Sequence, residues 1–291
     1  MHGDPIELIR SIARARERLS ESRSSKATIG LVPTMGALHE GHARLCEQAR
    51  HECHTVVVSI FVNPLQFDRD DDLRAYPRTL EADVELCQRL GVDVVFAPSP
   101  DEMYPTAALC TVDVSRIADY LCGRYRPGHF RGVATVVTKL LQIVQPDRAY
   151  FGEKDAQQLA IIRRLARDLN IPVEIVGVPT VREPDGLALS SRNRRLAPAE
   201  RLSAIALYRA LREAERQIAA GVTDVEFIKT KAAGEIPADP SLRLEYLEIV
   251  DPGDMWPLER ISGPVCVAGA LWVGAVRLID NLACSPPPAR G

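Results

Sequence analysis

Two histidines, His39 and His42, are the residues whose type and spacing most clearly suggest chemistry. They belong to the stretch Pro-Thr-Met-Gly-Ala-Leu-His-Glu-Gly-His at residues 33–42. Side chains three residues apart project to one side of a helical turn, and Gly36 and Gly41 let a ligand approach the backbone. Two imidazoles placed in this way suit the phosphates of a nucleotide. A loop whose histidines are merely exposed and polar is the simpler alternative.

The residues on either side of these histidines predict a strand, a turn and a helix. Residues 28–32 are an apolar run typical of a buried strand. Residues 42–50 place Leu45, Cys46 and Ala49 on one helical face. A helix leaves its first backbone N–H groups without helical partners, so we expect these groups to point at the ligand.

Other polar residues also follow predicted strands, which lie at residues 55–62, 147–151 and 173–178. These residues are Gln66, then Gly152, Glu153, Lys154 and Asp155, and then Ser190, Ser191 and Arg192. In an open α/β sheet, ligands bind outside the carboxyl ends of the strands. We therefore expect these residues to share one site with His39 and His42.

Lys154 precedes a predicted helix that runs to Leu169, a place where a lysine does nothing for the helix dipole. A cation near helix-start N–H groups is well suited to phosphate, so we assign Lys154 to the site. Asp155 and Gln158 fit a capping box, which needs no function. The hydroxyls and arginine of residues 190–192 can clamp phosphates, although a plain serine-rich turn has the same composition.

Two other polar stretches allow two interpretations each. Residues 124–132 carry three arginines and a histidine before a helix at residues 133–144, and they form either an anion-binding turn or a surface loop. Asp70, Asp71 and Asp72 open a polar loop. These acids either hold a cation or face solvent, and we prefer the solvated loop because it is the commoner meaning of an acidic run.

The remaining pattern predicts an α/β domain followed by a smaller α+β domain. A basic amphipathic helix at residues 6–19, a helix at 79–90 capped by Thr79, and strands at 91–97 and 110–114 complete the first. Helices at 198–220 and 225–233 then precede strands at 242–250, 265–272 and 275–279, which suit a small antiparallel sheet. We place the boundary near Thr180, with domains at residues 1–180 and 181–291.

Composition excludes several classes of protein. The formal net charge of −3 over 291 residues gives no electrostatic footprint for nucleic acid. The N-terminus does not fit a signal peptide, and no apolar run approaches the ~20 residues needed to cross a bilayer. Seven cysteines without a Cys-x-x-Cys pair suggest reduced, mostly buried thiols in a cytoplasmic protein. Residues 285–288, Ser-Pro-Pro-Pro, are expected to be disordered.

The stretch His-Glu-Gly-His resembles the nucleotide-binding signature of the class I nucleotidylyltransferase and aminoacyl-tRNA synthetase superfamily. The longer stretch at residues 33–42 resembles, more specifically, the pantothenate synthetase family. Further matching stretches extend this resemblance from Gly30 to Asn281, at residues 59–67, 76–79, 126–132, 151–155, 189–193 and 277–281.

The resemblance implies a Rossmann-like domain that binds ATP and pantoate, a C-terminal domain that closes over it as a lid, and a homodimer. The implied enzyme is a ligase that forms an amide bond between pantoate and β-alanine. ATP adenylates pantoate with release of pyrophosphate, and the amine of β-alanine then displaces AMP. Magnesium should accompany the triphosphate, and no nucleic acid or membrane takes part.

The resemblance also implies roles for individual residues. Catalytic roles fall to His42, His39, Lys154 and Arg192. The implied ATP-binding residues are Met35, Gly36, Ala37, Leu38, His39, Glu40, Gly41, His42, Gly152, Glu153, Lys154, Asp155, Val181, Leu189, Ser190, Ser191 and Arg192. Gln66 and Gln158 bind pantoate, and Gln66 also binds β-alanine.

This chain departs from the family pattern at two positions. Ala82 stands where some members carry a second acid beside Asp83, so we assign no protein ligand to the metal. Cys122 stands where Glu is frequent, which puts the local loop in doubt.

Two rival functions are a nucleotidylyltransferase, which keeps AMP in its product, and a nucleotide-sensing module without turnover. Glutamines at the acceptor pocket argue against a phosphorylated acceptor, and the full set of phosphate-handling groups argues against sensing alone.

Overall fold

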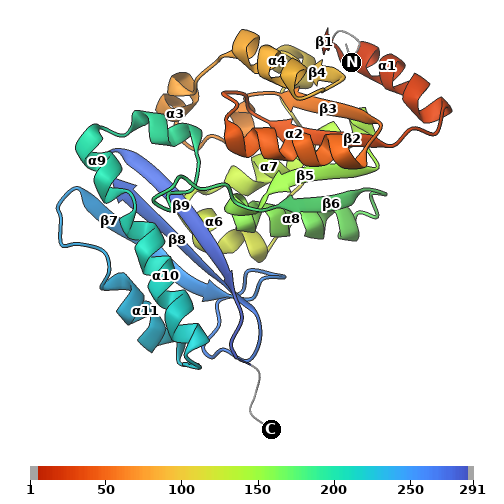
Figure 1. The fold of residues 1–291 in the computed structure, drawn as a ribbon. Helices are drawn as coiled ribbons and strands as arrows, with labels where there is room; N and C mark the ends of the chain where they lie inside the picture. Colours follow the sequence, from red (N-terminus) through yellow and green to blue (C-terminus); the bar gives the residue numbers. More distant parts are fainter. Residues whose placement is uncertain (1–5, 288–291) are drawn as a thin grey trace. The chain divides into compact units, whose positions relative to one another are not determined.

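The computed structural model describes residues 6–287, and its larger sheet has six parallel strands (Figure 1). The strands are β1 (Glu7–Ile9), β2 (Ile29–Thr34), β3 (Thr55–Ile60), β4 (Val94–Phe96), β5 (Arg148–Gly152) and β6 (Glu174–Val178). Their spatial order is β1-β4-β3-β2-β5-β6. From β2 the chain first builds outward through β3 and β4, and then returns to add β5 and β6 on the other side. This order confirms the predicted α/β class and places a topological switch point between β2 and β5.

Helices cover both faces of this sheet because its strands are apolar on both sides. On one face, α2 (Glu40–Glu52) buries Leu45, Cys46 and Ala49 against Val58 and Tyr150. Neighbouring strand residues point to the opposite face, where α7 (His129–Val144) packs along β2. The buried strands predicted from residues 28–32 and 55–62 are therefore confirmed.

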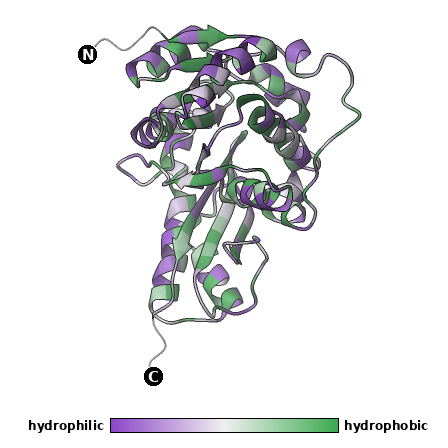
Figure 2. Cartoon of the chain, turned by 90° about the vertical axis from the view of Figure 1, so that its right-hand side faces the viewer, coloured by the Kyte–Doolittle hydropathy of each residue, from purple (hydrophilic) through white to green (hydrophobic). Residues whose placement is uncertain are grey.

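The second sheet has three antiparallel strands, β7 (Leu242–Val250), β8 (Val265–Val273) and β9 (Val276–Cys284). Helices α10 (Ala206–Ala219) and α11 (Val225–Ala233) pack on it, and Figure 1 shows both over one face. Strand β8 is apolar and its residues are almost all buried, whereas β7 and β9 mix apolar and charged residues, and Figure 2 accordingly shows green and purple segments in this unit. The predicted small antiparallel sheet is confirmed.

The chain divides into two compact units that are not single stretches of sequence. The first contains the chain up to Val114, Arg126–Glu153 and Ile161–Pro179. The second contains Ser115–Tyr125, Lys154–Ala160 and the chain from Thr180. The division into a substrate-binding domain at residues 1–180 and a lid at residues 181–291 stays a prediction, both in its boundary and in its roles.

Further helices connect these elements. They are α1 (Ile12–Ser24), α3 (Asp70–Ala75), α4 (Leu80–Arg89), α5 (Pro100–Met103), α6 (Leu121–Tyr125), α8 (Ala156–Asp168) and α9 (Pro198–Ser203), with 3-10 turns η1 (Pro64–Gln66), η2 (Ile117–Asp119), η3 (Glu153–Asp155) and η4 (Ser191–Arg195).

Three predicted elements near the N-terminal half are wrong. Residues 6–19 are not one helix, because β1 pairs with β4 and Ser11 then caps α1 by accepting a hydrogen bond from the N–H of Arg14. The acids at residues 70–72 do not open a loop but form the first turn of α3, where their negative charges interact favourably with the positive end of the helix dipole. Residues 110–114 form no strand, since the N–H of Val112 donates to the hydroxyl of Thr135 on α7 at 3.0 Å.

Two further predictions concern the second unit and the chain ends. The helix expected at residues 198–220 is two helices, α9 and α10, separated at the buried Ala204. The predicted disordered tail, residues 285–288, includes Pro288, which lies outside the described residues. The signal-peptide prediction concerns the start of the chain, where residues 1–5 also lie outside the described residues.

Membrane and cysteine predictions are also tested. No helix in the described part of the chain is long and apolar enough to span a membrane. Six of the seven cysteines are buried free thiols, and Cys110 is exposed. The prediction of mostly buried thiols is therefore confirmed.

Candidate active site

The loop after β2 is held by a carboxylate that comes from a distant helix. Gly36 and Ala37 both adopt positive φ, at 80° and 51°, a region that costs energy for alanine. Asp83 on α4 accepts the N–H of Ala37 at 2.9 Å and the N–H of Leu38 at 2.8 Å. The hydroxyl of Thr79 donates to the same carboxylate instead of capping α4. Asp83 is only 3% exposed, so its carboxylate holds the loop from the protein interior.

The two predicted histidines cap helix α2. The Nδ1 atom of His39 accepts the N–H of Gly41 at 3.1 Å, and Nδ1 of His42 accepts the N–H of His39 at 3.3 Å. Their ring centroids are 4.1 Å apart. Because each Nδ1 acts as an acceptor, the hydrogen-bond network assigns the ring proton to Nε2 in both neutral rings. The structure thus brings His39 and His42 together as a pair of Nε2–H donors.

The expectation of unpaired backbone N–H groups at this helix start is wrong for most of the loop. Protein groups accept the N–H of Gly36, Ala37, Leu38, His39, Gly41, His42 and Ala43. The side chains of Ala37 and Leu38 are buried as well. This turn therefore offers a phosphate imidazole donors and the positive end of the α2 dipole, rather than a row of amides.

Gln66, the predicted pantoate residue, lies beside Met35 at the same edge of the sheet. Its Nε2 donates to Sδ of Met35 at 2.9 Å, and its Oε1 accepts from Nδ2 of Asn63 at 3.1 Å. Asn63 is 1% exposed and also accepts a hydrogen bond from the hydroxyl of Tyr104 at 3.0 Å. Burial raises the pKa of Tyr104 to about 12, so this hydroxyl keeps its proton. Asn63 and Tyr104 orient Gln66, although the sequence reveals neither role.

The arginine-rich turn of residues 124–132 contacts the backbone of Gln66. His129 is within 2.7 Å of the carbonyl oxygen of Gln66 through Nδ1, and Arg126 donates to the same oxygen at 3.3 Å. Arg126 also pairs with Asp68 at 3.1 Å. The absence of a side chain at Gly132 lets α7 approach η1, since a Cβ there would lie 2.3 Å from the carbonyl oxygen of Leu65. Arg126, which binds protein groups, therefore fits neither an anion-binding turn nor a surface loop, the two interpretations of residues 124–132. Arg124 and Arg131 are exposed.

In the second unit, Lys154 lies in the turn η3, whose backbone is tied to β9. The carbonyl oxygen of Lys154 accepts a hydrogen bond from Nδ2 of Asn281 at 2.8 Å. The side chain of Lys154 is 18% exposed, and its Nζ is 3.9 Å from Oδ2 of Asp155. Asp155 belongs to η3, which runs directly into α8.

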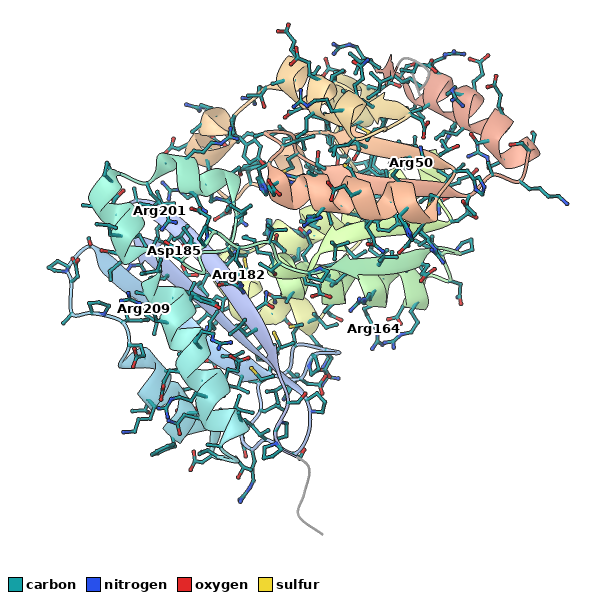
Figure 3. The ribbon with its side chains drawn as sticks, in the orientation of Figure 1. Arg50, Arg164, Arg182, Asp185, Arg201 and Arg209 are labelled. Atoms are coloured by element: carbon teal, nitrogen blue, oxygen red, sulfur yellow. The ribbon has the colours of Figure 1, made fainter. Side chains whose placement is uncertain are left out.

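Residues 181–192 form a narrow turn with the predicted ATP residues at its base. The N–H of Leu189 donates to the carbonyl of Val181 at 2.9 Å, and the hydroxyl of Ser190 caps η4 by accepting the N–H of Arg192 at 3.2 Å. Arg201 on α9 clamps the turn by pairing with Asp185 and Glu183; Figure 3 labels Asp185 and Arg201. Hydrogen bonding from Arg201 lowers the pKa of Asp185.

A family model described as pantoate-beta-alanine ligase matches residues 7–283 of this chain. The chain belongs to the pantoate–β-alanine ligase family. This membership confirms the resemblance, the ligase class and the Rossmann-like fold that the motifs predicted.

Individual relatives agree with the family match. The chain is 51% identical over 277 residues to the pantothenate synthetase of Moorella thermoacetica, covering 95% of this chain and 98% of that protein. It is 56% identical over 261 residues to a bifunctional pantoate ligase/cytidylate kinase of Thermosynechococcus vestitus, covering 89% of this chain and 51% of that protein. The chain thus spans about half the length of that bifunctional relative.

Solved structures of the family have the same fold. A crystal structure of pantothenate synthetase from Thermus thermophilus matches with a TM-score of 0.90 at 46% identity, over 95% of this chain and 99% of that one. A pantoate-beta-alanine ligase from Francisella tularensis, complexed with beta-gamma ATP and beta-alanine, matches with a TM-score of 0.78 at 36% identity, over 95% and 97%.

The two departures from the ligase family pattern leave ordered structure around them. The N–H of Cys122 donates to Oε1 of Gln157 at 3.0 Å, and Gln157 in turn donates to two backbone carbonyls. Gln157, which precedes the predicted pantoate residue Gln158 in the sequence, therefore has a structural role. Its hydrogen bonds hold the loop at Cys122 in place. Ala82 is exposed on α4.

The part of the chain that the structure describes offers magnesium no ready-made protein site. Within residues 6–287, no group of three or more histidine, cysteine, aspartate or glutamate side chains is placed to hold a metal ion. The carboxylate of Asp83 is already engaged by two N–H groups and a hydroxyl. The described side chains therefore do not fit a dedicated metal centre.

Proposed function

We propose that this chain condenses pantoate with β-alanine at the expense of ATP. The observation that carries the proposal is the family match over residues 7–283, which includes every residue assigned to the site. The paired Nε2–H donors of His39 and His42, beside the switch point of the sheet, supply the phosphate-directed chemistry that such a reaction needs.

The proposed reaction has two balanced steps. A carboxylate oxygen of pantoate attacks the α-phosphorus of ATP, the bond from that phosphorus to the bridging oxygen breaks, and pyrophosphate leaves. The amine of β-alanine then attacks the acyl carbon, AMP leaves with the bonding electron pair, and the nitrogen loses a proton. Adenylation is needed because a free carboxylate is a poor acyl donor.

Individual residues are assigned roles in the first step. His42 and His39 stabilise charge on the phosphates, and Lys154 stabilises the negative charge that develops on the five-coordinate phosphorus. Ser190, Ser191 and Arg192 hold the triphosphate, Val181 contacts the adenine, and Gln66 and Gln158 bind pantoate. Glutamine suits an acceptor that offers both hydroxyl and carboxylate groups, because its amide donates and accepts. Magnesium enters with ATP as part of the substrate.

Product analysis tests the function directly. The protein is incubated with ATP, magnesium, pantoate and β-alanine, and nucleotides and acyl products are separated by chromatography. AMP and pantothenate should appear in equal amounts. ADP with phosphate, or a product that retains AMP, would contradict the proposal and favour the nucleotidylyltransferase; absence of turnover with intact ATP binding would favour the sensing module.

We also propose a homodimer in the cytoplasm, on the basis of the family resemblance. Sedimentation velocity at micromolar concentrations should give the mass of two chains, and a single-chain mass throughout would refute the dimer. Fractionation of the source cells should recover the protein with cytoplasmic markers, and recovery in another fraction would refute the location.

A further inference from the structure

Strand β9 carries two adjacent polar residues, Asp280 and Asn281, that the proposed reaction does not use. They belong to the stretch at residues 277–281 that resembles the family pattern. Asp280 is 6% exposed, and a buried carboxylate on a strand is costly unless it is paired. The contacts of these two residues account for their position.

Asn281 reaches the backbone of the turn that presents Lys154. Its Nδ2 donates to the carbonyl oxygen of Lys154 at 2.8 Å, and its own N–H donates to Oδ1 of Asp280 at 2.8 Å. The bond to Lys154 links residues 127 positions apart. A backbone anchor at this residue fixes where the lysine side chain starts without occupying its ammonium group.

Asp280 reaches the turn that carries Val181 and Leu189. Its two oxygens accept from Arg182 at 2.6 Å and 3.0 Å, a bidentate pair that also fixes the orientation of the guanidinium. Arg182, labelled in Figure 3, donates in addition to the carbonyl of Gly186 at 3.0 Å and lies 4.6 Å from the centre of the Tyr208 ring. Burial raises the pKa of Asp280, while Arg182 and the positive charge of Lys154 act to lower it.

We propose that Asp280 and Asn281 are positioning residues. Together they fix the distance between the turn that carries Lys154 and the turn of residues 181–189. This inference rests on the proposed function, because it assigns Lys154 and Val181 to ATP. One pair of neighbouring residues on a rigid strand holds both turns, so the lysine that stabilises the phosphorus and the segment that contacts the base keep a fixed separation.

A double-mutant cycle tests whether Asn281 acts through Lys154. The variants are Asn281→Ala, Lys154→Ala and the double variant, and the measured rate is single-turnover formation of pantoyl adenylate at saturating ATP. Asn281→Ala should slow adenylation about 10- to 100-fold, as expected when a reacting group is misplaced by about 1 Å. In the Lys154→Ala background the same change should have almost no further effect. Equal losses in both backgrounds would overturn the proposal.

Two further variants separate positioning from folding. Asn281→Leu keeps roughly the size of the side chain and adds no charge but removes the Nδ2 donor, so it should slow adenylation while the melting temperature stays close to that of the parent; an unchanged rate would overturn the proposal. Leu282→Ala is the matched control on β9, because Leu282 packs on the core of the second unit. The factor by which Leu282→Ala changes the adenylation rate should be the same whether or not Lys154 is present.

Asp280→Asn should act on the other turn, raising the KM for ATP more than it lowers kcat; a loss confined to kcat would contradict its assignment to residues 181–189. The parent protein decides the proposed function separately. A parent that forms no pantoyl adenylate would refute the function, whereas an active parent with additive variants would refute only the positioning role.

Discussion

Asp83 shows how one buried carboxylate can fix the shape of the loop after β2. It accepts the N–H groups of Ala37 and Leu38 while Ala37 sits at positive φ. These bonds also withdraw both N–H groups from any phosphate. The imidazoles of His39 and His42, which cap α2, are the side chains of this loop that we propose to act on the phosphates.

Asp83→Ala should destabilise the protein and weaken ATP binding together. Two buried N–H groups would lose their acceptor, and leaving a buried donor unpaired costs about 1–3 kcal/mol. Thermal unfolding and the KM for ATP measure the two effects. Glu81→Gln, an exposed acid in the first turn of the same helix, is the control and should change neither. A loop that binds ATP normally in the Asp83→Ala variant would show that Asp83 is dispensable.

Lys154→Ala should slow adenylation far more than it weakens ATP binding. The reason is that a cation aimed at charge that develops in the transition state contributes little to the ground state. The loss of rate in single-turnover adenylation should be about 100-fold or more. Arg163→Ala, which removes an exposed cation from α8, serves as the control. Near-normal adenylation without Lys154 would remove this residue from the mechanism.

At the scale of elements, the turn of residues 183–187 depends on one arginine of α9. Arg201 pairs with Asp185 at 2.7 Å and with Glu183 at 2.6 Å. Hydrogen bonding from Arg201 depresses the pKa of Asp185 in the folded protein. The stability from this pair is therefore present above the ordinary aspartate pKa of about 3.9 and is lost as the pH falls through the lower folded value.

Arg201→Gln should accordingly lower the melting temperature at pH 7, and the difference from the parent should shrink as the pH falls below about 4. Thermal unfolding across this pH range measures it. Arg212→Gln breaks an exposed pair within α10 and should have little effect at any pH. A difference that is constant with pH would mean that Arg201 stabilises the turn by packing alone.

Elements could be predicted from sequence where their own residues determine them. The buried strands β2 and β3 are continuous apolar runs, and α11 begins and ends where the sequence pattern indicates. Strand β1 exists because Glu7 pairs with Val94, and residues 110–114 are no strand because Thr135 takes the N–H of Val112. Such distant partners leave no mark on the local sequence. The histidine pair could be found by its spacing, whereas Asp83 looked like an ordinary residue of a helix start.

At the scale of the whole molecule, the two-step reaction predicts a partial reaction that runs in both directions. With pantoate present, the protein should move labelled pyrophosphate into ATP without β-alanine, because the acyl phosphate anhydride is comparable in energy to the bond that was broken. His42→Ala should depress this exchange, since His42 is proposed to stabilise the phosphates in both directions. Exchange that strictly requires β-alanine would indicate a concerted route and would contradict an adenylate intermediate.

The sharing of chain segments between the two units has a consequence during synthesis on the ribosome. The first unit is complete once Pro179 has emerged, but the second waits for β9, which ends at Cys284. Residues 115–125 and 154–160 therefore emerge long before the strand residues Arg277 and Asn281, which contact Cys122 and Lys154. Until then Cys122 lacks its contact with Arg277, and the carbonyl of Lys154 lacks its hydrogen bond from Asn281. A ribosome paused between these points holds the nascent chain in the state most open to chaperones and to aggregation.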